Sequence, residues 1–419
     1  MTTNESSVEI LARGVREASG VLYDSSTAAK NRLLRAIMAR LRSKTAEVLA
    51  ANREDVEGAR REGLSGVLLD RLRLEEDGIR RMLRGVRDVI ALPDPVGRIL
   101  ETVKRPNGLK IQKMSVPLGA VGIIYEARPN VTVDASVLCL KSGNAVLLRG
   151  GSEALNTNRV LAGTLRTALE DAGLPPGSVG FIDSMDRESV AAMLRQREFL
   201  DVIIPRGSSQ LIAYVRENSA VPVIAHGEGN CHVFVDASAN LRRAGEIVFN
   251  AKVQRPSVCN AAEKLLVHGK IAVKFLPQIA ERLKCAGVEL RCDPGALALI
   301  PDGRPATESD WSREYLDLII AIRVVGDVRE AIDHINRYGS HHSDAIVTGS
   351  RANGERFLRS VDSAAVYVNA STRFTDGFEF GLGAEIGIST QKLHARGPMG
   401  LAELTSSKYI VHGTGQIRR

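Results

Sequence analysis

The stretch Ala145-Val-Leu-Leu-Arg-Gly-Gly-Ser-Glu153 decides the fold class, because it joins an apolar run to a glycine turn and then to a helix signal. Ala145–Leu148 is a continuous apolar run, which is typical of a strand buried on both faces. The two glycines permit a turn, and Ser152 is a residue type that caps helix N-termini. The stretch therefore predicts a strand, a loop and a helix that runs to Ala172.

A second segment of the same kind lies further along the chain. Asp201–Ile204 is predicted as another strand, Pro205-Arg-Gly-Ser-Ser209 is its loop, and a helix is expected through Leu211 and Val215. Val221–Ile224 is predicted as the next strand. Strands that alternate with helices in this way predict an α/β fold with a doubly wound parallel sheet. Ligands of such sheets bind at the carboxyl ends of the strands, where both loops lie.

The rest of the chain shows three other patterns. Residues 5–91 carry apolar side chains at helical spacing and predict a series of helices. From Leu109 the pattern changes to short strands and helices, and a second α/β unit is predicted to begin near residue 240. Phe374–Gly387 is glycine-rich and predicts a long functional loop, and Lys408–His412 predicts a final strand.

The composition sets the class of protein. The chain has 419 residues, of which 44% are hydrophobic and 25% charged, so two or three domains are expected. No run of 18 apolar residues is present, and Met1–Ser7 lack the features of a secretion signal, so no membrane span and no secretion are expected. Five cysteines without paired spacing predict reduced thiols in the cytoplasm.

The net charge of +7 is spread along the chain, and aromatic residues make up only 4%. A nucleic-acid-binding protein is expected to show a denser basic patch with exposed aromatic residues. A positive field that attracts small anionic substrates explains the charge equally well. Nucleic-acid binding is therefore the less favoured alternative.

Two segments are rich in metal-ligand residue types. His226-Gly-Glu-Gly-Asn-Cys-His232 lacks the paired cysteines or the His-Glu-x-x-His spacing of recognisable zinc sites. A flexible glycine loop beneath a ligand is the better interpretation. Ser340-His-His-Ser-Asp344 precedes a strand and is better explained as a polar turn. No metal site is predicted.

The two loops at the strand ends predict an anion site. Arg149–Glu153 and Pro205–Ser209 each follow a buried strand and open a helix, so backbone amides and the helix N-terminus favour a phosphate there. Neither loop has the spacing of a Rossmann or Walker motif, and an ordinary turn between strand and helix is the alternative. Arg149 would suit a cofactor that carries a 2′-phosphate.

Cys259, in Arg255-Pro-Ser-Val-Cys-Asn260, is the candidate nucleophile, because a thiolate in a polar turn beside an arginine is activated for attack. A buried structural cysteine is the alternative. Asn130 precedes a helix expected over Val133–Lys141 and either caps that helix or stabilises an oxyanion. Arg373 either binds a carboxylate or phosphate or forms a surface pair.

Together these segments resemble the family of γ-glutamyl phosphate reductases, also called glutamate-5-semialdehyde dehydrogenases, within the aldehyde dehydrogenase superfamily. The similarity covers nearly the whole chain. Its most specific segments are Tyr125-Glu-Ala-Arg-Pro-Asn-Val-Thr-Val-Asp134, Ile203-Ile-Pro-Arg-Gly207, Lys252-Val-Gln-Arg-Pro-Ser257 with Cys259-Asn260, and Tyr367-Val-Asn-Ala-Ser-Thr-Arg-Phe-Thr-Asp-Gly377.

The resemblance implies an aldehyde dehydrogenase-like fold: two doubly wound α/β domains with a helical N-terminal region and a small oligomerisation extension. Residues 1–240 would form the nucleotide-binding domain, with a segment near 108–125 partly in the oligomerisation sheet. Residues 241–380 would form the catalytic domain with Cys259. Residues 381–419 would return to the nucleotide domain and supply the oligomerisation tail.

The resemblance also implies the activity, which is the NADPH-dependent reduction of L-glutamyl 5-phosphate in the second step of L-proline biosynthesis. A glutamate 5-kinase would supply the substrate, and the enzyme would be a homo-oligomer. Cys259 matches the nucleophile of the superfamily and Asn130 its oxyanion amide. The cofactor-binding residues implied are Arg149, Glu153, Pro205, Gly207, Ser208 and Glu314. The residues expected to bind the substrate are Arg128, Arg255 and Arg373.

One departure from ordinary aldehyde dehydrogenases concerns the general base. Those enzymes use a glutamate to activate water against the thioester, and the matching position here falls near Ile224. Hydrolysis of a thioester on Cys259 would therefore lack assistance, whereas an acyl phosphate brings its own leaving group. An oxidative aldehyde dehydrogenase, which needs the base, is the alternative within enzymes.

Overall fold

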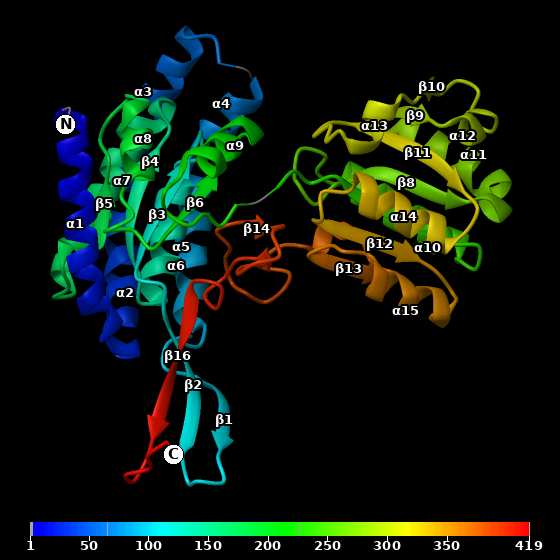
Figure 1. The fold of residues 1–419 in the computed structure, drawn as a ribbon. Coiled ribbons are helices and arrows are strands. Elements are labelled where there is room, and N and C mark those ends of the chain that lie inside the picture. Colours follow the sequence, from blue (N-terminus) through cyan, green and yellow to red (C-terminus); the bar gives the residue numbers. More distant parts are fainter. Residues whose placement is uncertain (1–2, 65, 226, 419) are drawn as a thin grey trace. The chain divides into compact units, whose positions relative to one another are not determined.

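The computed structural model describes residues 3–64, 66–225 and 227–418. The chain forms two compact units (Figure 1). The first ends at Ala225 and is completed by Gly381–Gly387 and the segment from Met399 onward. The second runs on to Phe380 and includes Ile388–Pro398. The predicted boundary at residue 240 was wrong, because the strand at residues 231–235 belongs to the sheet of the second unit.

The first unit begins with helices, as predicted for residues 5–91. Ser26 caps the second of them by accepting a hydrogen bond from Ala29 N, and the apolar stripe of that helix is buried. The bounds of the helices in this unit are α1 (Thr3–Tyr23), α2 (Thr27–Ser43), α3 (Thr45–Arg61), α4 (Gly66–Leu72), α5 (Glu76–Ala91), α6 (Asn130–Lys141), α7 (Leu155–Asp171), α8 (Glu188–Leu194) and α9 (Ser209–Asn218), with 3-10 turns η1 (Ser152–Ala154) and η2 (Pro176–Ser178).

A four-stranded parallel sheet forms the centre of the first unit, in the order β5-β4-β3-β6. Its strands are β3 (Ala120–Tyr125), β4 (Ala145–Gly150), β5 (Val179–Phe181) and β6 (Val202–Arg206). Every residue of β3 and β4 is buried, which explains why both strands are apolar apart from Arg149. Tyr125 pairs with both Gly150 and Arg206, so the loops that follow β3, β4 and β6 all begin at the carboxyl-terminal end of the sheet. This confirms the predicted parallel sheet.

Three local predictions in this unit were wrong. Ser152 does not cap a long helix but begins η1, and α7 starts at Leu155. Asp55 of α3 accepts hydrogen bonds from Asn156 N and Thr157 N at the start of α7, so a distant carboxylate replaces the local cap.

The helix predicted from Val133 is α6, which begins three residues earlier at Asn130. The strand predicted over residues 221–224 is only an isolated bridge between Val223 and Ile203, because Pro222 has no N–H for a ladder.

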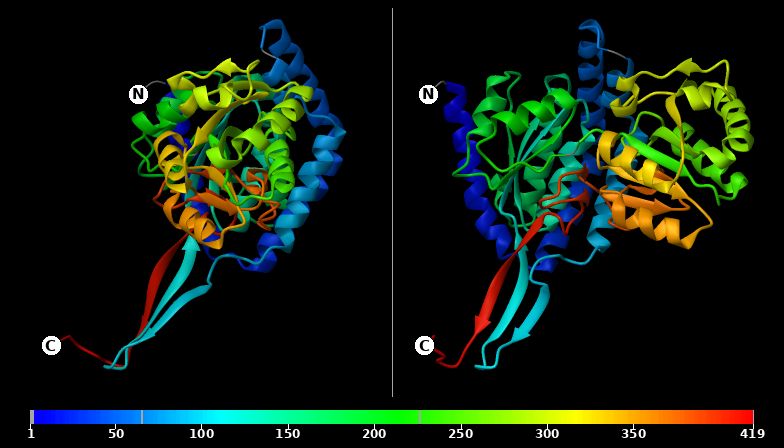
Figure 2. Two further views of the ribbon diagram at one scale, coloured as in Figure 1. Left: turned by 90° about the vertical axis from the view of Figure 1, so that its right-hand side faces the viewer. Right: turned by 45° about the vertical axis from the view of Figure 1, so that its right-hand side comes forward.

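An antiparallel three-stranded sheet projects from the first unit (Figure 2). It consists of β1 (Ile99–Lys104), β2 (Lys110–Pro117) and β16 (Thr405–His412), with β2 in the centre. The predicted strand Lys408–His412 is confirmed as part of β16. Tyr409 and Val411 remain 67% and 54% exposed, so a large part of the apolar surface of this sheet is open to solvent.

The second unit is built on a seven-stranded parallel sheet in the order β10-β9-β11-β8-β7-β12-β13 (Figure 1). Its strands are β7 (Cys231–Val235), β8 (Ala262–His268), β9 (Glu289–Cys292), β10 (Arg304–Pro305), β11 (Ile319–Val325), β12 (Ser343–Val347) and β13 (Ala365–Val368), with a separate pair β14 (Ile388–Ser389) and β15 (Gly397–Pro398). The parallel arrangement confirms a second α/β unit.

Helices cover both faces of the seven-stranded sheet. One core joins α10 and α11 to Val233, Leu265 and Ile320, and the other joins α14 and α15 to Phe234 and Leu266. The helices of this unit are α10 (Leu241–Val253), α11 (Gly269–Cys285), α12 (Pro294–Leu297), α13 (Glu308–Ser312), α14 (Val328–Tyr338) and α15 (Arg351–Ser360), with the 3-10 turn η3 (Thr372–Phe374). Beyond η3 the predicted loop to Gly387 has no helix or strand, as expected.

Candidate active site

Cys259 lies in the turn between α10 and β8, where its side chain is half-buried. Gly229 packs directly on it, since a Cβ at residue 229 would lie 1.8 Å from the Cys259 carbonyl oxygen. Only glycine permits this close approach. The predicted glycine loop therefore lies against the backbone of the candidate nucleophile, although His226 at its start lies outside the described residues.

Arg373 is fixed beside the nucleophile by two neutral side chains. Its Nε donates to Gln254 Oε1 at 3.0 Å, and its Nη1 donates to Asn260 Oδ1. Asn260 in turn donates to the Thr375 carbonyl at 2.8 Å. The residue next to Cys259 thus joins the nucleophile turn to the segment that carries Arg373.

The charge of Arg373 is not neutralised by an ion pair. Burial lowers the pKa of Arg373, and the neighbouring Arg255 lowers it further. Neither guanidinium forms an ion pair with a carboxylate anywhere in the described ranges. Two like charges that lie near one another, and that form no ion pair among the described residues, favour binding of an anion.

Glu314 also lies close to the nucleophile turn. Its Oε1 accepts a hydrogen bond from Gly229 N at 2.7 Å. Burial raises the pKa of Glu314 to about 7, and the nearby carboxylates of Glu263 and Glu228 raise it as well. Glu314 therefore helps to hold the glycine loop against Cys259.

A buried charge network underlies this part of the site, and the sequence reasoning missed it. Lys252 and Glu263 are fully buried and form an ion pair of 3.3 Å. Lys264 donates to the Arg313 carbonyl at 2.7 Å, and burial lowers the pKa of Lys264 to about 7. The signal was present as two adjacent charges, Glu263 and Lys264, directly before the apolar run Leu265–Val267 of β8.

Cys231 is a second thiol near the nucleophile that the sequence reasoning did not select. It is fully buried, and its Sγ donates to the Cys259 carbonyl at 3.1 Å. Burial raises the pKa of Cys231 well above its usual value. Cys231 therefore supports the turn as a neutral thiol, whereas Cys259 has the more open position.

The other predicted site residues belong to the first unit, where Arg149 is the last residue but one of β4. Its side chain is only 8% exposed, and burial lowers its pKa while Glu153 and Glu126 raise it. Its Nε has no hydrogen-bond partner among the described residues. An orphaned guanidinium nitrogen in a buried position fits a ligand with an anionic or strongly accepting group.

The loop after β6 brings Gly207 and Ser208 to the start of α9. Ser208 caps α9 by accepting a hydrogen bond from Leu211 N at 3.3 Å. Ser208 N donates to Glu126 Oε2 at 2.7 Å, and a Cβ at Gly207 would collide with the Glu126 carboxylate. The sequence reasoning did not select Glu126, which occupies the position of an anion at this helix N-terminus.

Asn130 is the first residue of α6, and Pro129 stands at the capping position. The side-chain Nδ2 of Asn130 donates to Asp134 Oδ2 at 2.8 Å, so this amide is not the helix cap. Arg128 is exposed in the loop just before α6. Asn130 and Arg128 belong to the first unit, whereas Arg255 and Arg373 belong to the second.

The segments with metal-ligand residue types are held by internal contacts. His232 Nδ1 lies 2.9 Å from Asp344 Oδ1, and both side chains are buried. Within residues 3–64, 66–225 and 227–418, no group of three or more histidine, cysteine or acidic side chains is arranged to hold a metal ion. No helix in the same ranges is long and apolar enough to span a membrane.

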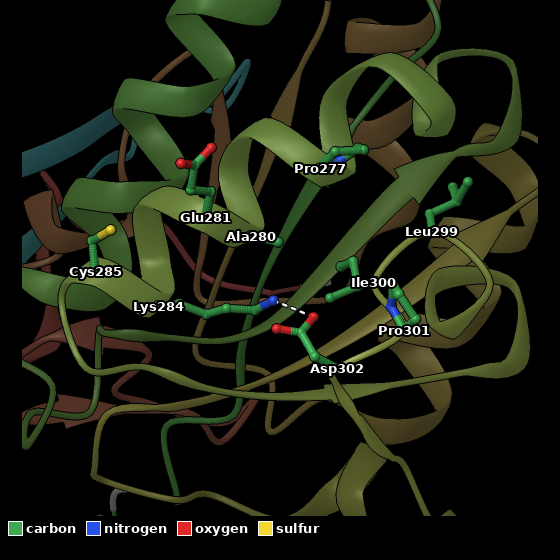
Figure 3. A pocket seen from close by; sticks show the side chains of 9 residues that line it. All are labelled: Pro277, Ala280, Glu281, Lys284, Cys285, Leu299, Ile300, Pro301 and Asp302. Carbon is green, nitrogen blue, oxygen red and sulfur yellow. Dashed lines mark hydrogen bonds and ion pairs between the residues drawn. The ribbon is translucent and has the colours of Figure 1, made fainter.

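An open hollow of about 330 Å³ lies on the second unit, beside α11 (Figure 3). Apolar side chains such as Pro277 and Leu299 line it, and an ion pair between Lys284 and Asp302 is part of its lining. None of the predicted site residues is among its lining residues. We therefore do not assign the reaction to this hollow.

Comparisons with known proteins give consistent results. The aldehyde dehydrogenase family model matches residues 4–297. The γ-glutamyl phosphate reductase of Caldicellulosiruptor saccharolyticus is 56% identical over 411 residues, which cover 97% of this chain and 98% of the relative. That of Moorella thermoacetica is 55% identical over 414 residues, covering 98% and 99%. The crystal structure of γ-glutamyl phosphate reductase from Thermotoga maritima superposes with a TM-score of 0.96 at 51% identity, covering 98% of this chain and 100% of that one.

Proposed function

Because the chain belongs to the aldehyde dehydrogenase family, and within it to the γ-glutamyl phosphate reductases, we propose that it reduces L-glutamyl 5-phosphate to L-glutamate 5-semialdehyde with NADPH. This is the second step of L-proline biosynthesis. The observation that carries the proposal is the half-buried Cys259 beside the cations Arg255 and Arg373, which have no carboxylate partner among the described residues. That combination suits a thiolate that attacks an anionic acyl phosphate.

In the proposed mechanism the Cys259 thiolate attacks C5 of the substrate, and the bond from C5 to the phosphate oxygen breaks. Phosphate leaves, and a thioester remains on Cys259. The cofactor supplies a hydride to this acyl group when it is bound. The resulting thiohemiacetal loses its C–S bond, which releases the aldehyde and restores the thiolate. Asn130 is the proposed donor to the oxyanion during attack.

The first unit is the proposed nucleotide-binding domain and the second the catalytic domain. Arg149, with its orphaned Nε, would hold the adenosine end of NADPH together with Glu153. Pro205 near the end of β6, together with Gly207 and Ser208 of the loop that follows, would hold the pyrophosphate. For that, Glu126 has to release Ser208 N, because the amide already has a carboxylate partner. Glu314 would hold the ribose of the nicotinamide and would then exchange its bond to Gly229 N.

The absence of the usual general base supports a phosphate-releasing reaction over aldehyde oxidation. Ile224 stands near the position of that base and is a buried apolar residue, 4% exposed. It cannot take a proton from water. An acyl phosphate needs no such help, because phosphate departs as a stable anion.

The activity can be tested directly by forming L-glutamyl 5-phosphate in the assay with a glutamate 5-kinase, ATP and L-glutamate. NADPH oxidation at 340 nm should require all three and should yield pyrroline-5-carboxylate, the cyclised product of the semialdehyde. NADPH oxidation that is independent of the kinase would contradict the proposed substrate.

A homo-oligomer formed through the three-stranded sheet is part of the proposal. Large apolar side chains of its outer strands, including Leu100 of β1 and Tyr409 of β16, are 56% and 67% exposed. Solvated apolar strands of this kind are suited to pairing with another copy of the chain. We also propose a cytoplasmic location, which the five free cysteines support.

Arg149→Ala is expected to weaken NADPH binding more than NADH binding. Only NADPH offers a 2′-phosphate to the guanidinium, and a charge-assisted hydrogen bond contributes roughly 1.5–3 kcal/mol. Fluorescence titration of the two cofactors measures the difference. An equal loss for both cofactors would show that Arg149 only shapes the loop. Arg159→Ala, at an exposed arginine of α7 paired with Asp183, is the matched control.

Arg373→Gln is expected to raise the KM for inorganic phosphate in the reverse reaction by roughly tenfold or more, since it removes one charge-assisted hydrogen bond. Steady-state kinetics with varied phosphate provide the measurement. Arg304→Gln serves as the control, because Arg304 lies on the surface of the same unit and is 71% exposed. An unchanged KM would mean that Arg373 only anchors Asn260.

A further inference from the structure

Asp134 lies one helical turn after Asn130 and is the only acidic residue of α6. Residues four positions apart on a helix face the same side, which brings the two side chains together. Asp134 Oδ2 accepts the hydrogen bond from Asn130 Nδ2 at 2.8 Å. The proposed mechanism gives this carboxylate no role of its own.

This hydrogen bond determines the orientation of the Asn130 side-chain amide. An ionised carboxylate only accepts hydrogen bonds, so Nδ2 and not Oδ1 must lie toward Asp134. The amide nitrogen carries two hydrogens, and Asp134 uses one of them. The second hydrogen of the same nitrogen therefore remains for another acceptor.

The surroundings of Asp134 do not supply another reason for a carboxylate at this position. Its side chain is half-buried and forms no ion pair with any residue that the structure describes. On the facing helix α5, a Cβ at Gly85 would lie 3.9 Å from Asp134 Oδ1, so α5 leaves room for the carboxylate. A partly buried carboxylate without a cation is costly, and an apolar residue would pack there at lower cost.

We propose that Asp134 is a positioning residue, which holds the Asn130 amide so that its second N–H is presented to the oxyanion of the substrate. The inference rests on the oxyanion role of Asn130 in the proposed function. Asp134 itself touches neither substrate nor cofactor in this assignment. It acts through the orientation of one amide group.

A double-mutant cycle tests the proposal, with the variants Asn130→Ala, Asp134→Ala and the two combined. Asp134→Ala is expected to lower kcat by about tenfold, while KM for phosphate in the reverse reaction stays unchanged. In the Asn130→Ala background, Asp134→Ala should cause no further loss of kcat, because the amide through which Asp134 acts is no longer present. Asp134→Asn keeps an accepting oxygen and should retain most of kcat.

The outcomes separate the inference from the proposed function. If Asn130→Ala keeps full kcat, the oxyanion role is wrong, and the role of Asp134 falls with it. If Asn130→Ala is slow but Asp134→Ala is not, only the positioning role is wrong. Additive losses in the double variant also overturn it, because they point to general damage to α6. Asp88→Asn, which removes a carboxylate from α5, is the control and should keep kcat.

The pH profile gives a second readout. Burial raises the pKa of Asp134 to about 6, and the hydrogen bond from Asn130 lowers it. The elements that pack on α6 are α2, α5, α7, β3 and β4. Among the described residues, none of their charged side chains contributes to this pKa shift. Protonated Asp134 keeps an accepting oxygen but loses the charge that strengthens its hydrogen bond, so kcat should fall modestly, to about the level of Asp134→Asn, as pH drops through about 6. Asp134→Asn should lose this acidic limb. An identical limb in that variant would contradict the proposal.

Discussion

Cys259→Ser is expected to lower kcat by about 10⁴-fold or more while leaving NADPH affinity nearly unchanged. A serine hydroxyl stays protonated near neutral pH, and neither Arg255 nor Arg373 can take its proton. The cofactor residues proposed in the first unit are not altered by the substitution. Stopped-flow or steady-state NADPH oxidation measures kcat, and NADPH fluorescence measures binding.

The other four cysteines provide matched controls for this prediction. Cys285 is exposed on α11, so Cys285→Ser should keep full activity. Cys139 and Cys292 are buried, and their substitution should affect stability more than kcat. Cys231→Ala removes the thiol bound to the Cys259 carbonyl and should lower kcat several-fold at most. A Cys231 variant as inactive as Cys259→Ser would show that the nucleophile has been assigned wrongly.

The second large effect concerns phosphate in the reverse reaction. With glutamate semialdehyde and NADP⁺, turnover should depend strongly on inorganic phosphate, because phosphate has to cleave the thioester on Cys259 unaided by a base. Arsenate should replace phosphate, since it is a similar oxyanion nucleophile. Without either anion, NADPH formation should stop after about one equivalent per Cys259, since hydrolysis lacks general-base catalysis. Intact-protein mass spectrometry should then detect the acylated cysteine.

Glu228 is the residue that could overturn this expectation. It lies exposed in the glycine loop one residue before Gly229, which packs on Cys259. Sustained turnover without phosphate or arsenate, lost in Glu228→Gln, would show that Glu228 activates water. The protein would then act as a simple aldehyde oxidiser. In the presence of phosphate, Glu228→Gln should leave the rate unchanged.

The sheets could be predicted because their strands are buried on both faces. Ala145–Leu148 and Val202–Ile204 show this as uninterrupted apolar runs, and both lie in the parallel sheet of the first unit. The first residues of the helices were harder to predict from the sequence. Ser152 has the residue type of a cap, but Asp55, which is 101 residues away from Asn156, satisfies the first amides of α7. A contact between residues so far apart in the chain cannot be predicted from the local sequence.

The reactive and charged residues of the candidate site could be predicted from the sequence, but most of the contacts that hold them in place could not. Cys259, Arg255 and Arg373 were selected from the sequence, and the structure places all three in one unit. Their roles remain predictions. The contact of Gly229 with Cys259 could not be derived, because it depends on the register of β7 beside β8. The hydrogen-bond acceptor of Asn130 could have been predicted, because Asp134 follows four residues later in the segment Tyr125–Asp134, which is the spacing of one helical turn.

The pairing of β16 with β2 sets the order in which the chain can fold. Asn144 in the first unit donates to the Leu404 carbonyl, 260 residues further along. During synthesis the central strand β2 lacks one neighbour until β16 has left the ribosome. The sheet of the second unit uses only β7 to β13 and can form earlier, which shortens the loop that remains to be closed. Completion of the first unit should thus be the late, slow event of folding, and nascent chains halted before residue 405 should expose an open strand edge.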